Sequence, residues 1–236
     1  MALDWLSRSI PLFGEDALNK IHNKTIAVVG LGGVGGSCCE TLCRCGIGQL
    51  ILLDYDKVEK SNRNRQLFAT KSTVGLSKCD AAIRRLNEVT EDTELIPLNI
   101  FYSEDTSDIL FSHSPDLIID AIDCVSSKLH LISTSNEKNI PILSCLGTGN
   151  RLDPSKFRIG KLEETAGCGC GLARVIRREC KKRDISPTAV LYSTEQPIKI
   201  DVCEKNGKRP PASSPFCPPV AGYILAAQAI KLLTLE

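Results

Sequence analysis

The chain has few aromatic residues, no long hydrophobic run and almost no net charge, and each of these shortages narrows what it can be. Aromatic residues make up 5% of its 236 residues and the formal net charge is +1, so global charge favours no acidic partner. No apolar run reaches the roughly 18 residues needed to cross a bilayer. The first 24 residues mix Asp4, Arg8 and Glu15 with apolar ones. We therefore expect no secretory signal, no membrane partner and a cytoplasmic location.

The chain also lacks the paired cysteines of a zinc site. None of its 12 cysteines forms a C-x-x-C pair, since one residue separates Cys43 from Cys45 and Cys168 from Cys170, and structural zinc sites are usually built from such pairs. Most cysteines fall inside predicted helices and strands, which favours reduced thiols in a cytosolic protein over a disulfide framework. We expect no zinc.

An alternation of apolar runs and helix-like segments predicts a single α/β domain over residues 1–236, with short helices within 1–24. Hydrophobic residues at 42% and charged residues at 24% are ordinary for a globular protein. Strands are predicted at 25–29, 49–54, 94–98, 117–121, 142–145, 156–162 and 189–193. Helices are predicted at 36–45, 75–89, 126–139, 172–182 and 220–235. Strand, turn, helix and strand within residues 25–54 form a βαβ unit, which predicts a mostly parallel sheet.

Residues 197–219 are rich in Pro, Ser, Lys and Gly, which predicts a mobile loop inside this domain rather than a linker between two domains. Cys203 and Cys217 fall in this segment. A catalytic or sulfur-accepting thiol is the less favoured interpretation, because no neighbouring group predicts a lowered thiol pKa.

The first glycine-rich turn predicts a phosphate-binding site. Gly30, Gly32, Gly33 and Gly35 form a G-x-G-x-x-G pattern between a strand and a helix, where glycine lets the backbone turn tightly and lets helix N–H groups face phosphate. Asp54 ends the next strand, where a carboxylate can accept hydrogen bonds from ribose hydroxyls. The alternative for Asp54 is a strand-end turn residue.

The residues after Asp54 separate two classes of nucleotide-binding protein. Asp56 leads into the cluster Asn62-Arg63-Asn64-Arg65-Gln66, whose guanidinium and amide groups suit a triphosphate. A dehydrogenase shares the glycine pattern and the acidic residue, but hydride transfer has no use for this cluster. A solvated turn is the alternative interpretation.

Three further charged residues extend the candidate site. Lys78 opens a predicted helix and is able to reach back to phosphate, whereas Asp120 and Asp123 stand at the carboxyl end of a strand, where open α/β sheets bind ligands. Asp123 is the candidate magnesium ligand. The alternatives are an exposed helix charge for Lys78 and helix caps for the two aspartates.

In this order, the motifs resemble the ubiquitin-activating E1 superfamily, which includes ThiF- and MoeB-like adenylyltransferases, over residues 24–150. The resemblance implies a Rossmann-like α/β adenylation fold, with a mostly parallel central sheet flanked by helices, that binds ATP and Mg²⁺. It implies that ATP is bound by Gly30, Gly32, Gly33, Gly35, Asp54, Asp56, Asn62, Asn64, Arg65, Gln66, Lys78, Asp120, Asp123 and Lys128. Of these, Asn64, Arg65, Lys78 and Asp123 are the predicted catalytic residues, and Arg65 leads as a stabiliser of transition-state charge.

Other motifs are similar to one branch, the tRNA threonylcarbamoyladenosine dehydratases, over nearly the whole chain. They are Arg8-Ser9-x-x-Leu12-Phe13-Gly14, Asp120-Ala121-Ile122-Asp123-x-x-x-x-Lys128 and Gly147-x-Gly149-Asn150-x-x-Asp153-Pro154. The branch implies a tRNA substrate whose adenosine next to the anticodon carries a threonylcarbamoyl group. ATP activates the threonyl carboxylate, and the neighbouring carbamoyl oxygen closes a ring with loss of water. No protein thiol is required.

The same resemblance implies a homodimer, and it leaves room for a monovalent cation and a sulfur-transfer partner. This chain departs from the branch at two places. Cys168-Gly169-Cys170-Gly171-Leu172-Ala173 stands where an Asp-Pro-Leu-Ala helix start is usual, and Arg63 occupies a position that is usually apolar. Both departures bear on how the substrate fits.

A strongly basic segment follows. Six basic residues lie within residues 174–183, and five of them are the predicted tRNA contacts: Arg174, Arg177, Arg178, Lys181 and Lys182. A solvated basic helix face is the alternative.

Two other functions stay open on the sequence. One is an adenylyltransferase for the C-terminus of a ubiquitin-like sulfur carrier, disfavoured by the missing zinc cysteine pairs. The other is a nucleotide-binding scaffold without turnover, since binding residues do not establish catalysis.

Overall fold

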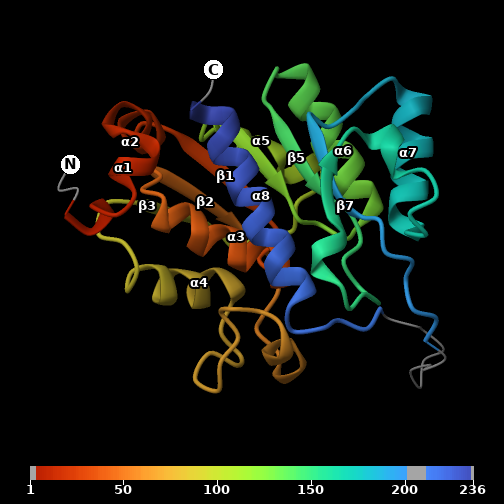
Figure 1. Cartoon of the computed structure of the whole chain (residues 1–236), viewed down its shortest axis with the longest axis horizontal. Helices are drawn as coiled ribbons and strands as arrows, with labels where there is room; N and C mark the ends of the chain where they lie inside the picture. Colours follow the sequence, from red (N-terminus) through yellow and green to blue (C-terminus); the bar gives the residue numbers. More distant parts are fainter. Residues whose placement is uncertain (1–3, 201–210, 235–236) are drawn as a thin grey trace.

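The computed structural model describes residues 4–200 and 211–234. Seven strands form one sheet in the order β3-β2-β1-β4-β5-β7-β6 (Figure 1). Their bounds are β1 Thr25–Val29, β2 Gln49–Leu53, β3 Glu94–Leu98, β4 Leu117–Asp120, β5 Ile142–Cys145, β6 Phe157–Gly160 and β7 Ala189–Ser193. Each neighbouring pair is parallel except β6 with β7, which is antiparallel at the sheet edge. The predicted mostly parallel α/β sheet is confirmed.

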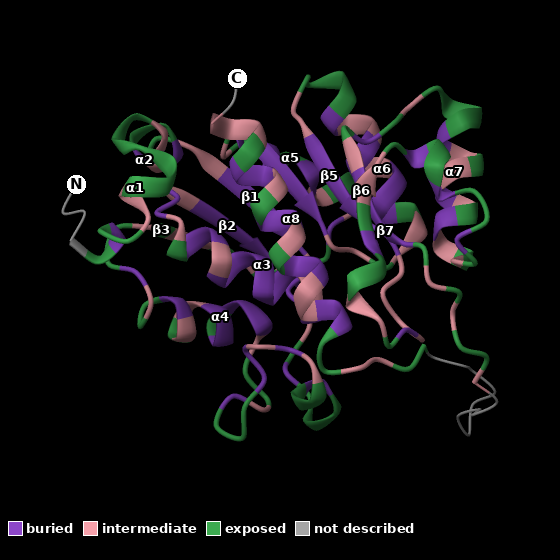
Figure 2. Cartoon of the chain, in the orientation of Figure 1, coloured by how far each residue is buried: buried purple, intermediate pink, exposed green. Residues whose placement is uncertain are grey.

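Helices cover both faces of the sheet and bury its inner strands, whereas the edge strands β3 and β6 stay partly exposed (Figure 2). They are α1 Ile10–Phe13, α2 Glu15–His22, α3 Gly33–Arg44, α4 Lys78–Leu86, α5 Ser107–Phe111, α6 Val125–Glu137, α7 Gly171–Arg183 and α8 Cys217–Thr234. Residues of α3, α4 and α8 form the hydrophobic core on one face, and residues of α5, α6 and α7 form it on the other. Because both faces are covered, the inner strands are continuous apolar runs rather than alternating ones.

Helix α8 lies directly against α3. A Cβ atom at Gly222 of α8 would lie 2.2 Å from the carbonyl oxygen of Val34 in α3 and 2.9 Å from the backbone nitrogen of Cys38. Only glycine permits this approach, so the position of α8 depends on one missing side chain. None of the helices in the ranges 4–200 and 211–234 is long and apolar enough to cross a membrane.

Three helix starts differ from the sequence-based expectation by three residues, and one of them is α4, which begins at Lys78 rather than Gly75. Helix α3 begins at Gly33 rather than Gly36, because glycines in a first turn reduce helix propensity without preventing the turn. Helix α8 begins at Cys217 rather than Val220, since proline is tolerated in a first helical turn. Cys217 is therefore a buried helical residue, and its thiol donates to the carbonyl oxygen of Arg151 at 3.3 Å. Cys203 and residues 201–210 of the predicted loop lie outside the described residues.

The order of the strands fixes where a ligand can enter. From β1 the chain moves outward through β2 and β3, then returns to the other side of β1 with β4 and continues through β5. The connections thus diverge between β1 and β4, and the space beyond the carboxyl ends of these two strands is the usual ligand site in open α/β sheets.

Candidate active site

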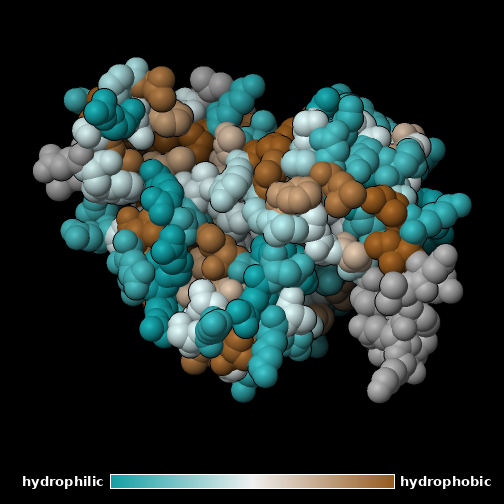
Figure 3. All heavy atoms as spheres, turned by 60° about the horizontal axis from the view of Figure 1, so that its bottom comes forward, coloured by the Kyte–Doolittle hydropathy of each residue, from teal (hydrophilic) through white to brown (hydrophobic). Residues whose placement is uncertain are grey.

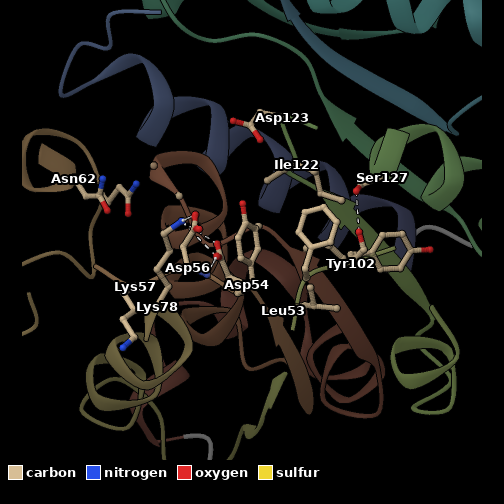
Figure 4. Close-up of a pocket in the computed structure, with 18 of the residues that line it drawn as sticks. Leu53, Asp54, Asp56, Lys57, Asn62, Lys78, Tyr102, Ile122, Asp123 and Ser127 are labelled. Carbon is tan, nitrogen blue, oxygen red and sulfur yellow. Dashed lines mark hydrogen bonds and ion pairs between the residues drawn. The ribbon is translucent and has the colours of Figure 1, made fainter. Parts of the chain in front are cut away.

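A cavity of about 410 Å³ opens beyond the carboxyl ends of β1, β2 and β4. Figure 4 shows its acidic, basic and aromatic side chains facing a common space. Of the predicted ATP-binding residues, ten line it: Gly30, Gly32, Gly33, Asp54, Asp56, Asn62, Arg65, Gln66, Lys78 and Asp123. The structure therefore brings together most of the predicted site, although its segments are dispersed along about 95 residues.

The glycine turn forms a cradle for an anion. Gly30 has a φ of +95°, and a Cβ atom there would lie 2.8 Å from the carbonyl oxygen of Ala121. Gly35 does not line the cavity; a Cβ atom there would lie 1.8 Å from the carbonyl oxygen of Gly30, so this glycine permits close packing of α3 on β1. The N-cap residue, Gly32, provides no side-chain hydrogen bond. The first N–H groups of α3 are thus free of a side-chain cap and suit a phosphate group.

Asp54, Asp56 and Lys78 form a linked charge cluster in the cavity wall (Figure 4). Lys78 Nζ lies 3.2 Å from Asp54 Oδ2 and 2.7 Å from Asp56 Oδ2. The buried carboxylate of Asp54 also accepts hydrogen bonds from the backbone nitrogens of Leu31 at 2.7 Å and Asp56 at 2.9 Å. Burial opposes the charge on Lys78, but the two carboxylates outweigh it and raise the lysine pKa. The ammonium group therefore stays charged at neutral pH, which suits contact with phosphate.

The cluster from Asn62 to Gln66 closes another side of the cavity. Asn62 and Gln66 are buried, and Asn62 Oδ1 accepts a hydrogen bond from the backbone nitrogen of Glu59 at 3.1 Å. Arg65 Nη1 donates to Asn64 Oδ1 at 2.8 Å. Asn64 does not line the cavity, since its Nδ2 donates to the carbonyl oxygen of Ser213 at 2.9 Å. Asn64 is thus placed to orient Arg65 and to connect this segment to the residues before α8.

Asp120 and Lys128 lie away from the cavity. Both are fully buried, with Lys128 Nζ 2.7 Å from Asp120 Oδ2 and 3.0 Å from the carbonyl oxygen of Cys145. Ser144 Oγ donates to the same aspartate oxygen at 2.7 Å, and Asp120 Oδ1 accepts from the backbone nitrogen of Ile122 at 3.1 Å. The pair shapes the turn that carries Asp123 into the cavity, rather than lining the cavity itself.

Several cavity residues were not singled out from the sequence. Tyr55 and Phe101 form an edge-to-face pair at 4.9 Å between ring centroids, half-exposed in the cavity wall, and Lys57, Tyr102 and Ser127 also line it. Two exposed aromatic rings suit a purine base. Their position just beyond the ends of strands could have indicated that they line the cavity, because the carboxyl ends of parallel strands meet at one edge of the sheet.

A second cavity, about 710 Å³, adjoins the first. Both are lined by Arg65, Ala121, Ile122 and Asp123. The second cavity extends over residues 145–151 after β5 and residues 169–172 at the start of α7. A nucleotide in the first cavity would therefore have room beside it for a second reactant.

Helix α7 carries the predicted tRNA contacts. Arg174, Arg178, Lys181 and Lys182 are exposed, whereas the half-buried Arg177 donates through Nη1 to Thr165 Oγ1 at 2.8 Å. Arg178 pairs with Glu179 at 2.8 Å. Cys170 is the N-cap of α7, and its sulfur accepts from the backbone nitrogen of Ala173 at 3.4 Å. The cysteine thus takes the capping role of a usual Asp.

The cysteines carry no disulfide among the described residues. Burial raises the pKa of Cys79 and Cys180 to about 11. Cys124, beside Asp123, differs: hydrogen bonds from Ser126 and Ser127 lower its thiol pKa. Within the described part of the chain, no three His, Cys, Asp or Glu side chains gather closely enough to hold a metal ion by themselves.

The chain is similar to a known protein family along nearly its whole length. A family model described as the ThiF family matches residues 6–236. The chain belongs to the ThiF family. This ThiF-family chain is 36% identical over 240 residues to the tRNA threonylcarbamoyladenosine dehydratase of Bacillus subtilis, covering 97% of this chain and 94% of the relative.

Two solved structures of the Escherichia coli tRNA N6-threonylcarbamoyladenosine dehydratase share the fold of this ThiF-family chain. The AMP complex has a TM-score of 0.88 and 27% identity, covering 97% of this chain and 93% of that one. The ATP complex has a TM-score of 0.88 and 26% identity, covering 99% and 95%. The predicted adenylation fold is confirmed over nearly its whole length.

Proposed function

We propose that the chain catalyses the ATP-dependent cyclisation, by dehydration, of N6-threonylcarbamoyladenosine next to the anticodon of a tRNA. The observation that carries the proposal is the pair of adjoining cavities that share Arg65 and Asp123, in a chain whose relatives include a dehydratase matched along nearly its full length. One cavity has the phosphate cradle of a nucleotide site, and the other gives a second reactant access to it.

The residues fit ATP in defined roles. The first turn of α3 would bind phosphate, Tyr55 and Phe101 would contact the base, and Asp54 would bind the ribose. ATP would supply the adenylyl or phosphoryl group that converts the threonyl carboxylate into a mixed anhydride, with release of pyrophosphate or ADP, and AMP or phosphate would then be the leaving group of ring closure. Arg65 and Lys78 would neutralise the charge that develops on the transferred phosphorus.

Asp123 would hold Mg²⁺ together with the phosphates. A single carboxylate is a usual protein contribution to a magnesium site, because this ion keeps several waters and phosphate oxygens as ligands. A monovalent cation is a further candidate. The Mg²⁺ requirement is checked by measuring ATP turnover with Mg²⁺ and then with excess chelator. The monovalent cation is checked by measuring turnover in potassium, in sodium and in a bulky organic cation.

Ring closure needs positioning more than it needs a nucleophilic side chain. The carbamoyl group is already joined to the activated carboxylate through the threonine, so its attack is intramolecular. The second cavity would hold this group and exclude water, which would otherwise hydrolyse the mixed anhydride. The net change in the nucleoside is the loss of one water.

Helix α7 would contact the tRNA, because its start lines the second cavity and its exposed Arg174, Arg178, Lys181 and Lys182 present positive charge farther along the same helix. Figure 3 shows the face at the bottom of Figure 1, where hydrophobic residues form separate patches among hydrophilic ones. Such a surface suits a polar, hydrated partner.

A homodimer is proposed as well. Leu12 is 83% exposed, and Trp5 and Phe13 near it are each 41% exposed, which suits an interface between copies. Sedimentation showing a monomer at micromolar concentration would exclude the homodimer.

A sulfur-transfer protein is a further proposed partner. The test is whether such a protein co-purifies with the unchanged chain and with the Cys124→Ser variant.

The proposed function is tested by incubating the protein with ATP, Mg²⁺ and tRNA that carries threonylcarbamoyladenosine. Mass spectrometry of the digested tRNA should show loss of one water from that nucleoside. An unchanged nucleoside, with ATP consumed only when a ubiquitin-like sulfur carrier is added, would assign the chain to carrier adenylation instead. If ATP is consumed with neither substrate, the remaining interpretation of the chain is a nucleotide-binding scaffold without turnover.

A further inference from the structure

The second cavity contains a buried arginine that no carboxylate of residues 4–200 and 211–234 neutralises. Arg151 follows β5, is 2% exposed and lines this cavity but not the nucleotide cavity. Its Nε donates to the carbonyl oxygen of Gly147 at 3.5 Å and its Nη2 to that of Cys168 at 3.2 Å. Arg151 takes part in none of the ion pairs found among the described residues.

One donor of this arginine is left over. Arg151 Nη1 is buried and has no hydrogen-bond partner within residues 4–200 and 211–234. Burying a charged donor without a partner is costly, and an anion that joins the guanidinium removes that cost. Since the other two nitrogens are fixed by carbonyl groups from two loops, the guanidinium is already oriented before a ligand arrives.

The surroundings of Arg151 favour a small planar anion. The first residues of α7, a helix of 13 residues, line the same cavity, and a helix N-terminus carries partial positive charge. Asn150, which also lines the cavity, is held by its backbone nitrogen, which donates to the carbonyl oxygen of Ala212 at 2.7 Å, and by its Oδ1, which accepts from the backbone nitrogen of Ala212 at 2.7 Å. The cavity thus has fixed walls around its positive end.

We propose that Arg151, together with the N-terminus of α7, binds the carboxylate of the substrate's threonylcarbamoyl group and presents it to the nucleotide cavity. The inference rests on the proposed function and assigns the substrate-binding part of that site. Arg65 and Asp123, which line both cavities, mark the boundary that the carboxylate must reach. A guanidinium suits this role because its hydrogen bonds to a carboxylate are charge-assisted, and Nη1 is the nitrogen available for one.

The test compares the binding of two tRNAs, one with threonylcarbamoyladenosine and one with plain adenosine at the same place. The unchanged protein should prefer the modified tRNA. In Arg151→Met this preference should fall by roughly 10- to 100-fold, as for a lost charge-assisted hydrogen bond, while affinity for unmodified tRNA and for ATP stays within about twofold. Arg151→Gln, which keeps a donor for the carbonyl groups, should show the same loss and serves if the Met variant does not fold.

Arg158→Met is the matched control. Arg158 also donates only to carbonyl oxygens, those of Ser155 at 2.8 Å and Phe157 at 2.7 Å, but it is exposed and lines neither cavity. A full preference for modified tRNA in the folded Arg151 variants overturns the inference. An equal loss for both tRNAs overturns it too, because it would mean a contact with a backbone phosphate. If unchanged protein forms no dehydrated nucleoside and shows no preference, the proposed function itself fails.

Discussion

At the residue scale, Arg65 lies at the boundary between the two cavities. It is half-buried, it lines both cavities, and Asn64 accepts one of its hydrogen bonds. Under the proposed function, a cation at that boundary would face the place where phosphate and carboxylate meet. Its charge would be needed most when negative charge increases on the phosphate during transfer.

We expect Arg65→Ala to lower kcat by about 100- to 1000-fold, the usual effect of removing one group that stabilises transition-state charge. The measurement is ATP consumption with modified tRNA. Arg63→Ala is the control, since Arg63 is exposed and lines neither cavity, and it should keep its rate. Equal losses in the two variants would contradict the role given to Arg65.

Lys128 is expected to act on stability. Lys128→Met would leave the carboxylate of Asp120 buried without its cation, which costs about 3–5 kcal/mol of unfolding free energy. Denaturant unfolding at pH 7 measures it. The exposed Lys60 provides a control, because Lys60→Met should change stability by no more than about 0.5 kcal/mol. A fully stable Lys128→Met variant would show that Asp120 takes up a proton or another partner.

The site could be predicted from the sequence where a residue type and a strand end coincide. The glycines before a helix and Asp54 after a strand could be placed at the cavity from their positions in the sequence alone. Asp120 and Lys128 were predicted to bind ATP but do not line the cavity, because Asp120 is still inside β4 and its side chain points into the core. The role of Arg151 could not be predicted from the sequence. Its Nη1 is left without a partner only in the folded chain, where Nε and Nη2 bond to the carbonyl oxygens of Gly147 and Cys168.

At the element scale, the contact between α3 and α8 is set by Gly222. Gly222→Ala should lower the free energy of unfolding by about 1–3 kcal/mol, as for an overpacked core, because its methyl group would press on the backbone of α3. Thermal unfolding measures the change. Gly171→Ala, at a helical position with nothing within 4 Å of its added Cβ atom, should not destabilise the chain. A neutral Gly222→Ala variant would show that α8 can shift along α3.

Glu40 connects α3 to α4 and makes stability depend on pH. Burial opposes its ionisation, but hydrogen bonds from Arg85 at 2.8 Å and Arg44 at 2.8 Å outweigh it and lower its pKa. A lowered folded-state pKa adds stability that is complete above the unfolded value of about 4.3 and is lost as pH falls through the folded value.

Glu40→Gln should therefore cost about 1 kcal/mol at pH 7, with the difference from unchanged protein shrinking below about pH 4. Urea unfolding from pH 3 to pH 8 measures it. Glu88→Gln is the control, because Glu88 is 71% exposed and 4.0 Å from Arg85. A difference that stays constant down to pH 3 would show that packing, rather than charge, causes the loss.

Elements with strong patterns could be predicted closely from the sequence: β1, β3, β5 and β7 have the expected bounds. Short α5 was not predicted, because five residues are too few to show a helical period. The antiparallel direction of β6 was also not predicted, since direction depends on the path of the connection and not on the residues of the strand.

At the scale of the whole molecule, α7 joins the second cavity to a basic surface. Its 13 residues span about 20 Å at the usual rise, from the cavity wall to Lys181 and Lys182. A nucleoside held in the cavity would thus belong to a strand whose phosphates can follow the same helix.

Lys181→Glu combined with Lys182→Glu should weaken tRNA binding at least tenfold and reduce its salt dependence, with ATP affinity unchanged. Titration at several salt concentrations measures both. Lys20→Glu with Lys231→Glu is the control, as both are exposed lysines outside α7 and the two active-site cavities. Equal weakening in the two double variants would mean that overall charge, rather than α7, attracts the tRNA.

Helix α8 is made last among the described elements, yet it packs against α3, whose first turn forms the phosphate cradle. A chain still being synthesised therefore has all seven strands before α3 has its supporting partner. Until residues 217–234 leave the ribosome, a hydrophobic face of α3 stays open to chaperones. The first turn of α3 thus gains its supporting helix only after residues 217–234 have been made.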